Sequence, residues 1–299
     1  MRSNRILSVF LCVLMIGSMF ASMASAAAPK IGLAISTLNN PFFVDLRDGA
    51  LEEAKKAGLG ITVADAQNDP NRQLSQVENF IQQGVNIILV NPCDSAAIVS
   101  AIKAANRAKI PVITVDRGAD GGEVICHIAS DNVQGGQMAG EYLAKLIGYK
   151  GKVVEIQGIP GASAARDRGK GFNEVMKKYP NIKIVARQEA GFDRAKGMTV
   201  MENILQAQPD IDGVFCHNDE MALGALRAIE AAGRLSAIKI VGFDATDDAI
   251  KAVQDGKLVA TVAQKPRAMG SMAVTVAKRV LDGAKVDAFI PVPLELVAK

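Results

Sequence analysis

Short apolar segments of strand length alternate with segments of helical periodicity along most of this 299-residue chain. The first example is the apolar run 30–35, which leads through Asn40 and Pro41 into a segment whose apolar stripe continues to Ala57. Asn40 is a suitable helix cap, and Pro41 fits a first helical turn. A helix after each strand, over short connections, indicates right-handed crossovers and a parallel sheet. The alternation therefore predicts an α/β fold.

The alternation runs in two series with no Pro-rich or Ser-rich linker between them, so we expect two similar lobes, each with a doubly wound parallel sheet. The expected strands are 30–35, 61–64, 87–90, 111–115 and 124–128, and then 152–157, 182–187, 213–217, 239–243 and 258–263. The helices expected after the first are 71–83, 95–108, 132–146, 163–178, 193–207, 220–232, 247–255 and 266–281.

The first 26 residues have the pattern of a secretory signal peptide. Arg2 and Arg5 form its basic start, residues 6–20 are apolar, and Ala-Ser-Ala at 24–26 offers a cleavage site. An amino-terminal membrane anchor is the alternative. Without the two arginines the formal net charge falls from +3 to +1, so we expect no nucleic-acid partner. The sequence predicts an exported chain that starts near Ala27.

Three cysteines follow this segment, and each lies within or just after an apolar run: Cys93, Cys126 and Cys216. An odd number in an oxidising compartment cannot pair completely, and we expect all three to be buried and unpaired. The only histidines are His127 and His217, and their spacing from the cysteines matches no metal site. Since Cys216 and His217 are adjacent in a strand, they lie on opposite faces. We expect neither a metal nor a cofactor.

Polar side chains stand at the ends of many of the predicted strands, which is the edge where open α/β sheets bind ligands. If both sheets direct that edge at one cleft, these groups converge there with the rings of Phe42, Phe43 and Phe192. Each group alone could have a structural role, such as the helix cap that Asn218 could provide. The candidate site residues are Ser36, Asn40, Phe42, Phe43, Asn91, Asp116, Arg117, Arg166, Phe192, Asn218, Asp244 and Gln264.

The residue types in this set suit a neutral polyhydroxyl ligand. Asp116 and Asp244 can accept hydrogen bonds from adjacent hydroxyls, while Arg117 and Arg166 can donate through planar guanidinium groups. Hydrogen bonds to charged groups contribute about 1.5–3 kcal/mol each. Several of them could therefore outweigh the dehydration of a small sugar, whose C–H faces would pack on the phenyl rings.

Several short segments also resemble one known family when they are taken together. They are residues 36–43, 91–92, 115–117, 163–166, 192–194, 218–226, 241–244 and 263–264. In these segments the chain is similar to the periplasmic sugar-binding proteins of ABC importers, and the likeness runs over essentially the whole mature chain. It implies a type I periplasmic binding protein with a three-strand hinge. The implied first lobe is 27–130 with 265–293, and the second is 131–264 with 294–299.

The resemblance implies capture of D-ribose in the periplasm by hinge closure and delivery to an ABC permease in the inner membrane. It assigns ribose contacts to the same candidate residues, and it implies a monomer with a chemoreceptor as a further candidate partner. Cys93 stands where the family pattern usually has Thr, and His217 where Gln is common. These departures leave the sugar selectivity open.

Three alternatives remain. Asp116 and Asp244 could form a glycosidase pair, but residues 161–165 lack the final Gly of a nucleophile elbow and 169–171 is not a P-loop, so we expect no enzyme. A transcription regulator with a similar sugar-binding core would need a helix-turn-helix where this sequence has an export signal. The third alternative is another small ligand, such as allose, galactose or autoinducer-2.

Overall fold

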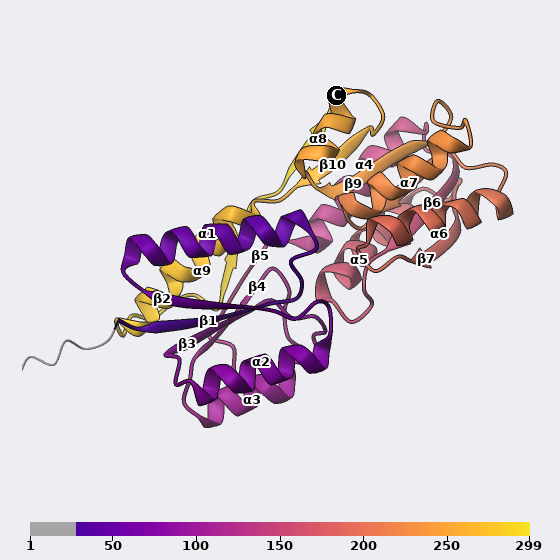
Figure 1. Cartoon of the computed structure of the whole chain (residues 1–299). Coiled ribbons are helices and arrows are strands. Elements are labelled where there is room, and N and C mark those ends of the chain that lie inside the picture. Colours follow the sequence, from indigo (N-terminus) through magenta and orange to yellow (C-terminus); the bar gives the residue numbers. More distant parts are fainter. Residues whose placement is uncertain (1–27) are drawn as a thin grey trace, which may run out of the picture.

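The structure is a computed structural model that describes residues 28–299. The predicted signal peptide, residues 1–26, therefore lies outside the described residues. The described chain forms two α/β lobes, each built on a six-stranded sheet, and Figure 1 shows the lobes side by side with crossing segments between them. No helix within 28–299 is long and apolar enough to cross a membrane.

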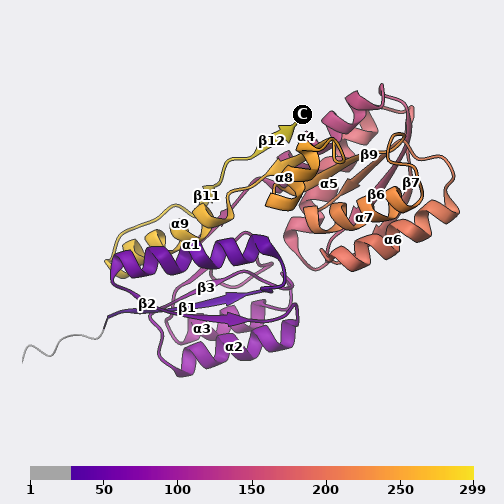
Figure 2. The ribbon, with the colours of Figure 1, turned by 45° about the horizontal axis from the view of Figure 1, so that its top comes forward.

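The first lobe contains a sheet with the order β11-β5-β4-β3-β1-β2, in which every pairing is parallel. Its strands are β1 (Lys30–Ile35), β2 (Gly60–Asp65), β3 (Ile87–Val90), β4 (Val112–Val115), β5 (Cys126–Ala129) and β11 (Phe289–Pro291). Two helices cover each face (Figures 1 and 2). They are α1 (Pro41–Ala57) with α9 (Pro266–Leu281), and α2 (Pro70–Gln82) with α3 (Val99–Arg107).

The second lobe contains a sheet with the order β12-β10-β9-β8-β6-β7. Its strands are β6 (Gly151–Gln157), β7 (Ile182–Glu189), β8 (Gly213–Cys216), β9 (Lys239–Asp244), β10 (Ala260–Ala263) and β12 (Glu295–Ala298). One face carries α4 (Asn132–Leu146) and α5 (Ser163–Lys178), and the other carries α6 (Arg194–Ala207), α7 (Asp219–Ala231) and α8 (Asp247–Gln254). Only β12 runs antiparallel in this sheet, against β10.

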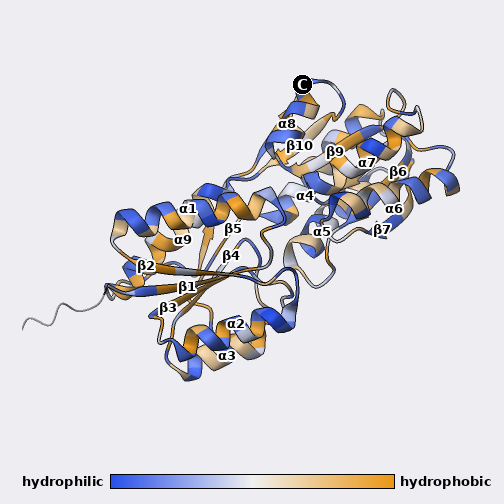
Figure 3. Ribbon diagram, viewed as in Figure 1, coloured by the Kyte–Doolittle hydropathy of each residue, from blue (hydrophilic) through white to orange (hydrophobic). Residues whose placement is uncertain are grey.

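Both faces of each sheet are buried, which explains the continuous apolar runs in the sequence. In β3, Ile87 and Leu89 join the core beneath α1 and α9, whereas Ile88 and Val90 join the core beneath α2 and α3. Successive side chains of a strand point to opposite faces, so a strand covered on both sides is apolar throughout. Figure 3 shows these apolar strands lying between amphipathic helices.

The chain passes between the lobes three times: after β5, after β10, and between β11 and β12. Figure 2 shows the β11–β12 passage at the end of the chain. The predicted fold of two doubly wound lobes with a three-strand connection is confirmed. The short strands β11 and β12 were not predicted individually, because each has few residues and little burial. The predicted lobe boundaries, near residues 130, 264 and 293, stay a prediction.

The helix caps confirm the local reading of the sequence. Asn40 Oδ1 accepts a hydrogen bond from Phe42 N at 2.9 Å, and Pro41 is the first residue of α1. Asp131 caps α4 in the same way, through Gln134 N. The helix expected from residue 95 begins instead at Val99, because residues 95–98 form a turn.

The three cysteines of the described chain are unpaired and buried, as predicted. Burial raises the pKa of the Cys93 thiol to about 12, so this sulfur is a weakly reactive thiol at neutral pH. Within residues 28–299 no group of three or more His, Cys, Asp or Glu side chains is arranged to hold a metal ion.

Candidate ligand-binding site

A small cavity lies between the lobes, where strands of both sheets end. Its first-lobe residues come from the segment after β1, which leads into α1, and from the segment after β4. Its second-lobe residues come from α5, from the end of β9 and from the segments after β7, β8 and β10. The lining residues are Asn40, Phe42, Phe43, Asp116, Arg117, Ala164, Arg168, Phe192, Asn218, Asp244 and Gln264. The expected convergence of strand-end side chains on one cleft is therefore present.

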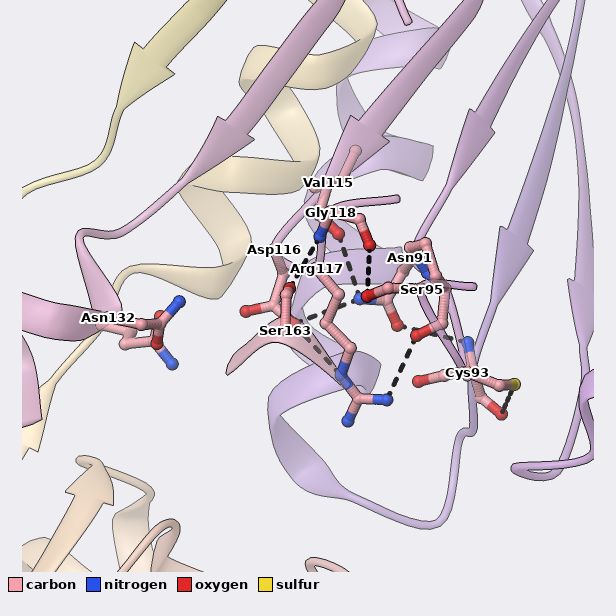
Figure 4. A network of polar contacts seen from close by, with 12 residues as sticks. Asn91, Cys93, Ser95, Val115, Asp116, Arg117, Gly118, Asn132 and Ser163 are labelled. Carbon is pink, nitrogen blue, oxygen red and sulfur yellow. Dashed lines mark hydrogen bonds and ion pairs between the residues drawn. The ribbon is translucent and has the colours of Figure 1, made fainter. Parts of the chain in front are cut away.

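Two of the predicted site residues, Ser36 and Asn91, lie behind this lining instead of in it. Asn91 Nδ2 donates to Asp116 Oδ2 at 3.1 Å and to the Val115 carbonyl at 3.0 Å, and Asn91 Oδ1 accepts from Ser36 N at 3.3 Å. Figure 4 shows Asn91 beside Asp116 in this network. Asn91 thus orients a cavity carboxylate from behind.

A third predicted site residue, Arg166, lies outside the cavity, contrary to the sequence-based expectation. Its side chain is 43% exposed and its Nη2 lies 2.9 Å from Asp120 Oδ1. The second-lobe arginine that lines the cavity is Arg168, which the sequence analysis did not single out.

Helical periodicity explains why Arg168 and not Arg166 reaches the cavity. The buried stripe of α5 includes Ala164, Phe172 and Val175. Arg168 lies on this stripe, one turn after Ala164 and one turn before Phe172, whereas Arg166 is off it. The stripe is visible in the sequence, so extending it back to the start of the helix would have identified Arg168.

The Arg168 guanidinium is held from several sides and is only 3% exposed. Its Nε donates to Asn132 Oδ1 at 2.8 Å, its Nη1 donates to the His217 carbonyl at 2.6 Å, and Nη1 lies 3.6 Å from Asp244 Oδ1. Its Cζ lies 3.8 Å from the centre of the Phe243 ring, a cation–π distance. The group is therefore oriented before any ligand binds.

Close packing of α4 on α5 brings Asn132 within reach of Arg168. A Cβ at Gly136 would lie 2.1 Å from the Arg168 carbonyl oxygen, and a Cβ at Gly171 would lie 2.0 Å from the Val133 carbonyl oxygen. Only glycine permits two helix backbones to approach this closely. These two glycines thus help to set the position of a cavity residue.

On the first-lobe side, the main charged groups are Asp116 and Arg117, each 3% exposed. Arg117 Nε lies 3.8 Å from Asp116 Oδ2, and Arg117 Nη1 donates to the Pro92 carbonyl at 3.3 Å. The Arg117 Cζ also lies 5.0 Å from the centre of the Phe43 ring and 5.1 Å from that of Phe192. Arg117 thus contacts aromatic rings of both lobes.

Three buried polar atoms of cavity residues have no hydrogen-bond partner within the described chain: Asp116 Oδ1, Arg117 Nε and Gln264 Oε1. Buried polar atoms in native proteins nearly always have a partner. A ligand with hydroxyl groups could supply both donors and acceptors to these atoms.

Three cavity residues have a left-handed backbone, which is costly for residues other than glycine. Their φ angles are 64° at Asp116, 63° at Phe192 and 118° at Asp244. Such conformations cost on the order of 1–3 kcal/mol each and concentrate at functional sites. The surrounding fold therefore imposes the orientation of these side chains.

Burial changes the acidity of the two cavity carboxyls. It raises the pKa of Asp244 to about 7, although Arg168 and the hydrogen bond from Gln264 Nε2, at 2.8 Å, act in the opposite direction. Burial likewise raises the pKa of Asp116, against the opposing effect of Arg117. Both carboxyls are strong hydrogen-bonding groups in a water-poor site.

Asn218 combines the two roles that the sequence left open. Its Oδ1 accepts from Met221 N at 3.0 Å and so caps α7, while its Nδ2 donates to the Phe192 carbonyl at 3.4 Å. The same side chain lines the cavity.

Fold and cavity together define a class: a two-lobed binding protein that encloses a small polar ligand between its lobes. A family model for the periplasmic binding protein domain matches residues 31–285. The chain belongs to this family of periplasmic binding proteins.

Individual relatives agree with this assignment. The ribose import binding protein of Salmonella typhimurium is 53% identical over 278 residues, which cover 93% of each chain. That of Bacillus subtilis is 51% identical over 89% of this chain and 86% of its own.

A solved solute-binding protein from Bacillus halodurans with bound myo-inositol is 37% identical, with a TM-score of 0.87 over 92% of this chain and 96% of its own. One from Actinobacillus succinogenes with bound D-allose is 34% identical, with a TM-score of 0.85 over 91% and 98%.

Proposed function

We propose that this protein captures D-ribose in the periplasm by closure of its two lobes and delivers it to an ABC permease in the inner membrane. The observation that carries the proposal is the cavity, which combines buried carboxylates and guanidinium groups with three phenyl rings. A monosaccharide has the matching mixture of hydroxyl groups and apolar C–H faces.

We propose ribose rather than another sugar because the relatives at 51–53% identity are named ribose import binding proteins. The proposed direct contacts are the polar and aromatic lining residues, with Arg168 in the role that the sequence analysis gave to Arg166. Asn91 acts through Asp116. Ser36 Oγ is buried without a partner within residues 28–299 and is a further candidate contact.

The remaining parts of the proposal concern location and partners. Export through the predicted signal peptide would place the mature chain in the periplasm. There we expect a monomer that docks on its permease in the closed form, with a chemoreceptor as a second docking partner. The alternative ligands, bound by the same closure of the lobes, are allose, galactose and autoinducer-2. Allose is the first of these to test, because a similar solved protein contains bound D-allose.

Calorimetric titration of the purified mature protein with D-ribose, D-allose, D-galactose and autoinducer-2 tests the proposal. We expect one-to-one binding that is tightest for D-ribose. Tighter binding of another of these ligands would move the assignment to that ligand. Absence of binding to all of them would refute the proposed function.

A further inference from the structure

Three segments of the two lobes meet outside the cavity lining, and we call this meeting the interlobe contact. Its first-lobe segments are 94–95, after β3, and 118–120, after β4, and its second-lobe segment is 161–166, which includes the start of α5. None of these residues except Ala164 lines the cavity. The interlobe contact is therefore distinct from the surface that would touch a sugar.

Three polar contacts cross between the lobes here. Ser95 N donates to the Gly161 carbonyl at 2.9 Å, and Gly118 N donates to Ser163 Oγ at 2.9 Å. Figure 4 shows Ser163 next to Gly118. Arg166 Nη2 donates to Asp120 Oδ1 at 2.9 Å in the third contact.

Arg166 connects these contacts to one another. Its Nη1 donates to the Gly161 carbonyl at 2.9 Å, so the oxygen that accepts from Ser95 also accepts from Arg166. The backbones are close at this point, because a Cβ at Gly161 would lie 1.9 Å from Asp94 Oδ2. The two lobes therefore fit against each other here through polar groups that need no ligand.

We infer that the interlobe contact stabilises the closed arrangement of the lobes and so sets the affinity for every ligand, without taking part in ligand selection. This inference rests on the proposed function. The open arrangement lacks the crossing hydrogen bonds, so loss of one favours opening and faster ligand release. A residue that acts only on the opening equilibrium changes the affinity for all ligands by the same factor.

The test uses Arg166→Ala and Asp120→Ala, which alter exposed side chains and leave the cavity intact. Each variant should raise the dissociation rate of D-ribose and of D-allose about two- to fivefold, as expected for an exposed ion pair. The association rates and the ratio of the two affinities should not change. The double variant should behave like Arg166→Ala alone, because truncation of Arg166 already removes the interaction that Asp120 makes across the lobes.

A matched control is Arg267→Ala. Arg267 pairs with Glu52 at 3.0 Å with similar exposure, but both residues lie within the first lobe. This variant should release both sugars at the parent rate. Ser163→Ala should accelerate release about five- to tenfold, since it leaves the Gly118 N–H without its acceptor.

Salt separates the two kinds of contact. Raising the ionic strength from about 0.01 M to about 0.5 M should shrink the effect of Arg166→Ala but not that of Ser163→Ala, because an exposed ion pair is screened. Parent-like release from Arg166→Ala at low salt would overturn the inference. So would a changed affinity ratio between the two sugars, or an equal effect of Arg267→Ala.

If the parent binds neither sugar, the proposed function fails, and small-angle scattering of the sugar-free protein then decides on the interlobe contact. The parent should have a smaller radius of gyration than Arg166→Ala and Ser163→Ala. Equal radii would overturn the inference.

Discussion

The two walls of the cavity hold their charged groups differently. On the first-lobe wall, Asp116 and Arg117 pair with each other at 3.8 Å, and each keeps a buried atom without a hydrogen-bond partner in the described chain. On the second-lobe wall, Arg168 is bound by Asn132 and by the His217 carbonyl. Both charged residues of the first-lobe wall thus have hydrogen-bonding capacity free for a ligand. On the second-lobe wall the arginine is already bound internally, and the atom without a partner among residues 28–299 is Gln264 Oε1.

A further buried layer supports the second-lobe wall. The imidazole of His217 lies between Gly158 N, 3.3 Å from Nδ1, and Glu155 Oε1, 3.0 Å from Nε2. Burial lowers the pKa of His217, although Glu155 acts in the opposite direction, so the ring is neutral and donates from Nε2. Arg187 Nε also donates to Glu155, at 2.8 Å. Changes to this wall should therefore affect folding as well as binding.

The largest effect is expected at Arg168. Arg168→Ala leaves Asp244 without its guanidinium partner in a buried site, and truncating one partner of such a pair costs about 2–5 kcal/mol of binding. The affinity for D-ribose should fall at least about 30-fold by calorimetry. Arg168→Lys should restore little of it, because an ammonium cannot make the same planar contacts.

Arg166→Ala is the control for Arg168→Ala, two residues away on the same helix. It should weaken binding only a few-fold, because Arg166 lies outside the cavity. If Arg168→Ala bound ribose as well as Arg166→Ala does, the assigned second-lobe wall would be wrong.

A smaller effect is expected behind the first-lobe wall. Asn91→Ala removes the donor to Asp116 Oδ2 and the acceptor of Ser36 N. Leaving a buried polar group unpaired in this way costs about 1–3 kcal/mol of stability. Ribose affinity should fall about tenfold, with a lower unfolding temperature of the sugar-free protein. Unchanged affinity in titrations would show that Asp116 does not need Asn91 for its orientation.

The smallest effect concerns pH and comes from behind the second-lobe wall. Asp219 is fully buried, and burial together with nearby Asp244 raises its pKa to about 8. It accepts hydrogen bonds from Thr261 Oγ1 at 2.7 Å and from Thr246 N at 2.8 Å. In the unfolded chain this carboxyl has a pKa near 3.8. The folded state thus binds the extra proton, and stability falls as pH rises from about 4 through about 8.

Thermal unfolding checks this sign best between pH 6.5 and about 8. Below that window the buried His127 and His217, whose pKa values are lowered by burial, contribute in the opposite direction and so mask the effect of Asp219. Within it, the parent should lose a few degrees of unfolding temperature, as about 1 kcal/mol corresponds to about 2–4 °C in chains of this size. Asp219→Asn should flatten the decline. A parent whose unfolding temperature rises across the window would contradict the assignment.

Much of the fold could be predicted from the sequence because its signals are local. The apolar run 30–35, the cap at Asn40 and the proline after it all depend on neighbours within a few residues. The strands β11 and β12 escaped prediction because they are held by pairing with β5 and β10, far away in the chain.

The site was predictable in part for a related reason. Side chains that directly follow strands share an edge of the sheet, so Asp116, Asn218 and Gln264 could be grouped before any coordinates were known. Arg166 was misplaced because a position within a helix depends on a rotation of about 100° per residue, and two residues separate opposite faces.

By itself, the sequence determined the alternation of elements, the two series and most of the residues at the strand ends, since these follow from hydrophobic period and capping chemistry. Only the tertiary structure decided which arginine enters the cavity, that Asn91 works from behind Asp116, and that Arg166 joins the lobes from outside. These outcomes depend on how helices and lobes pack against one another, and packing joins residues that no local pattern connects.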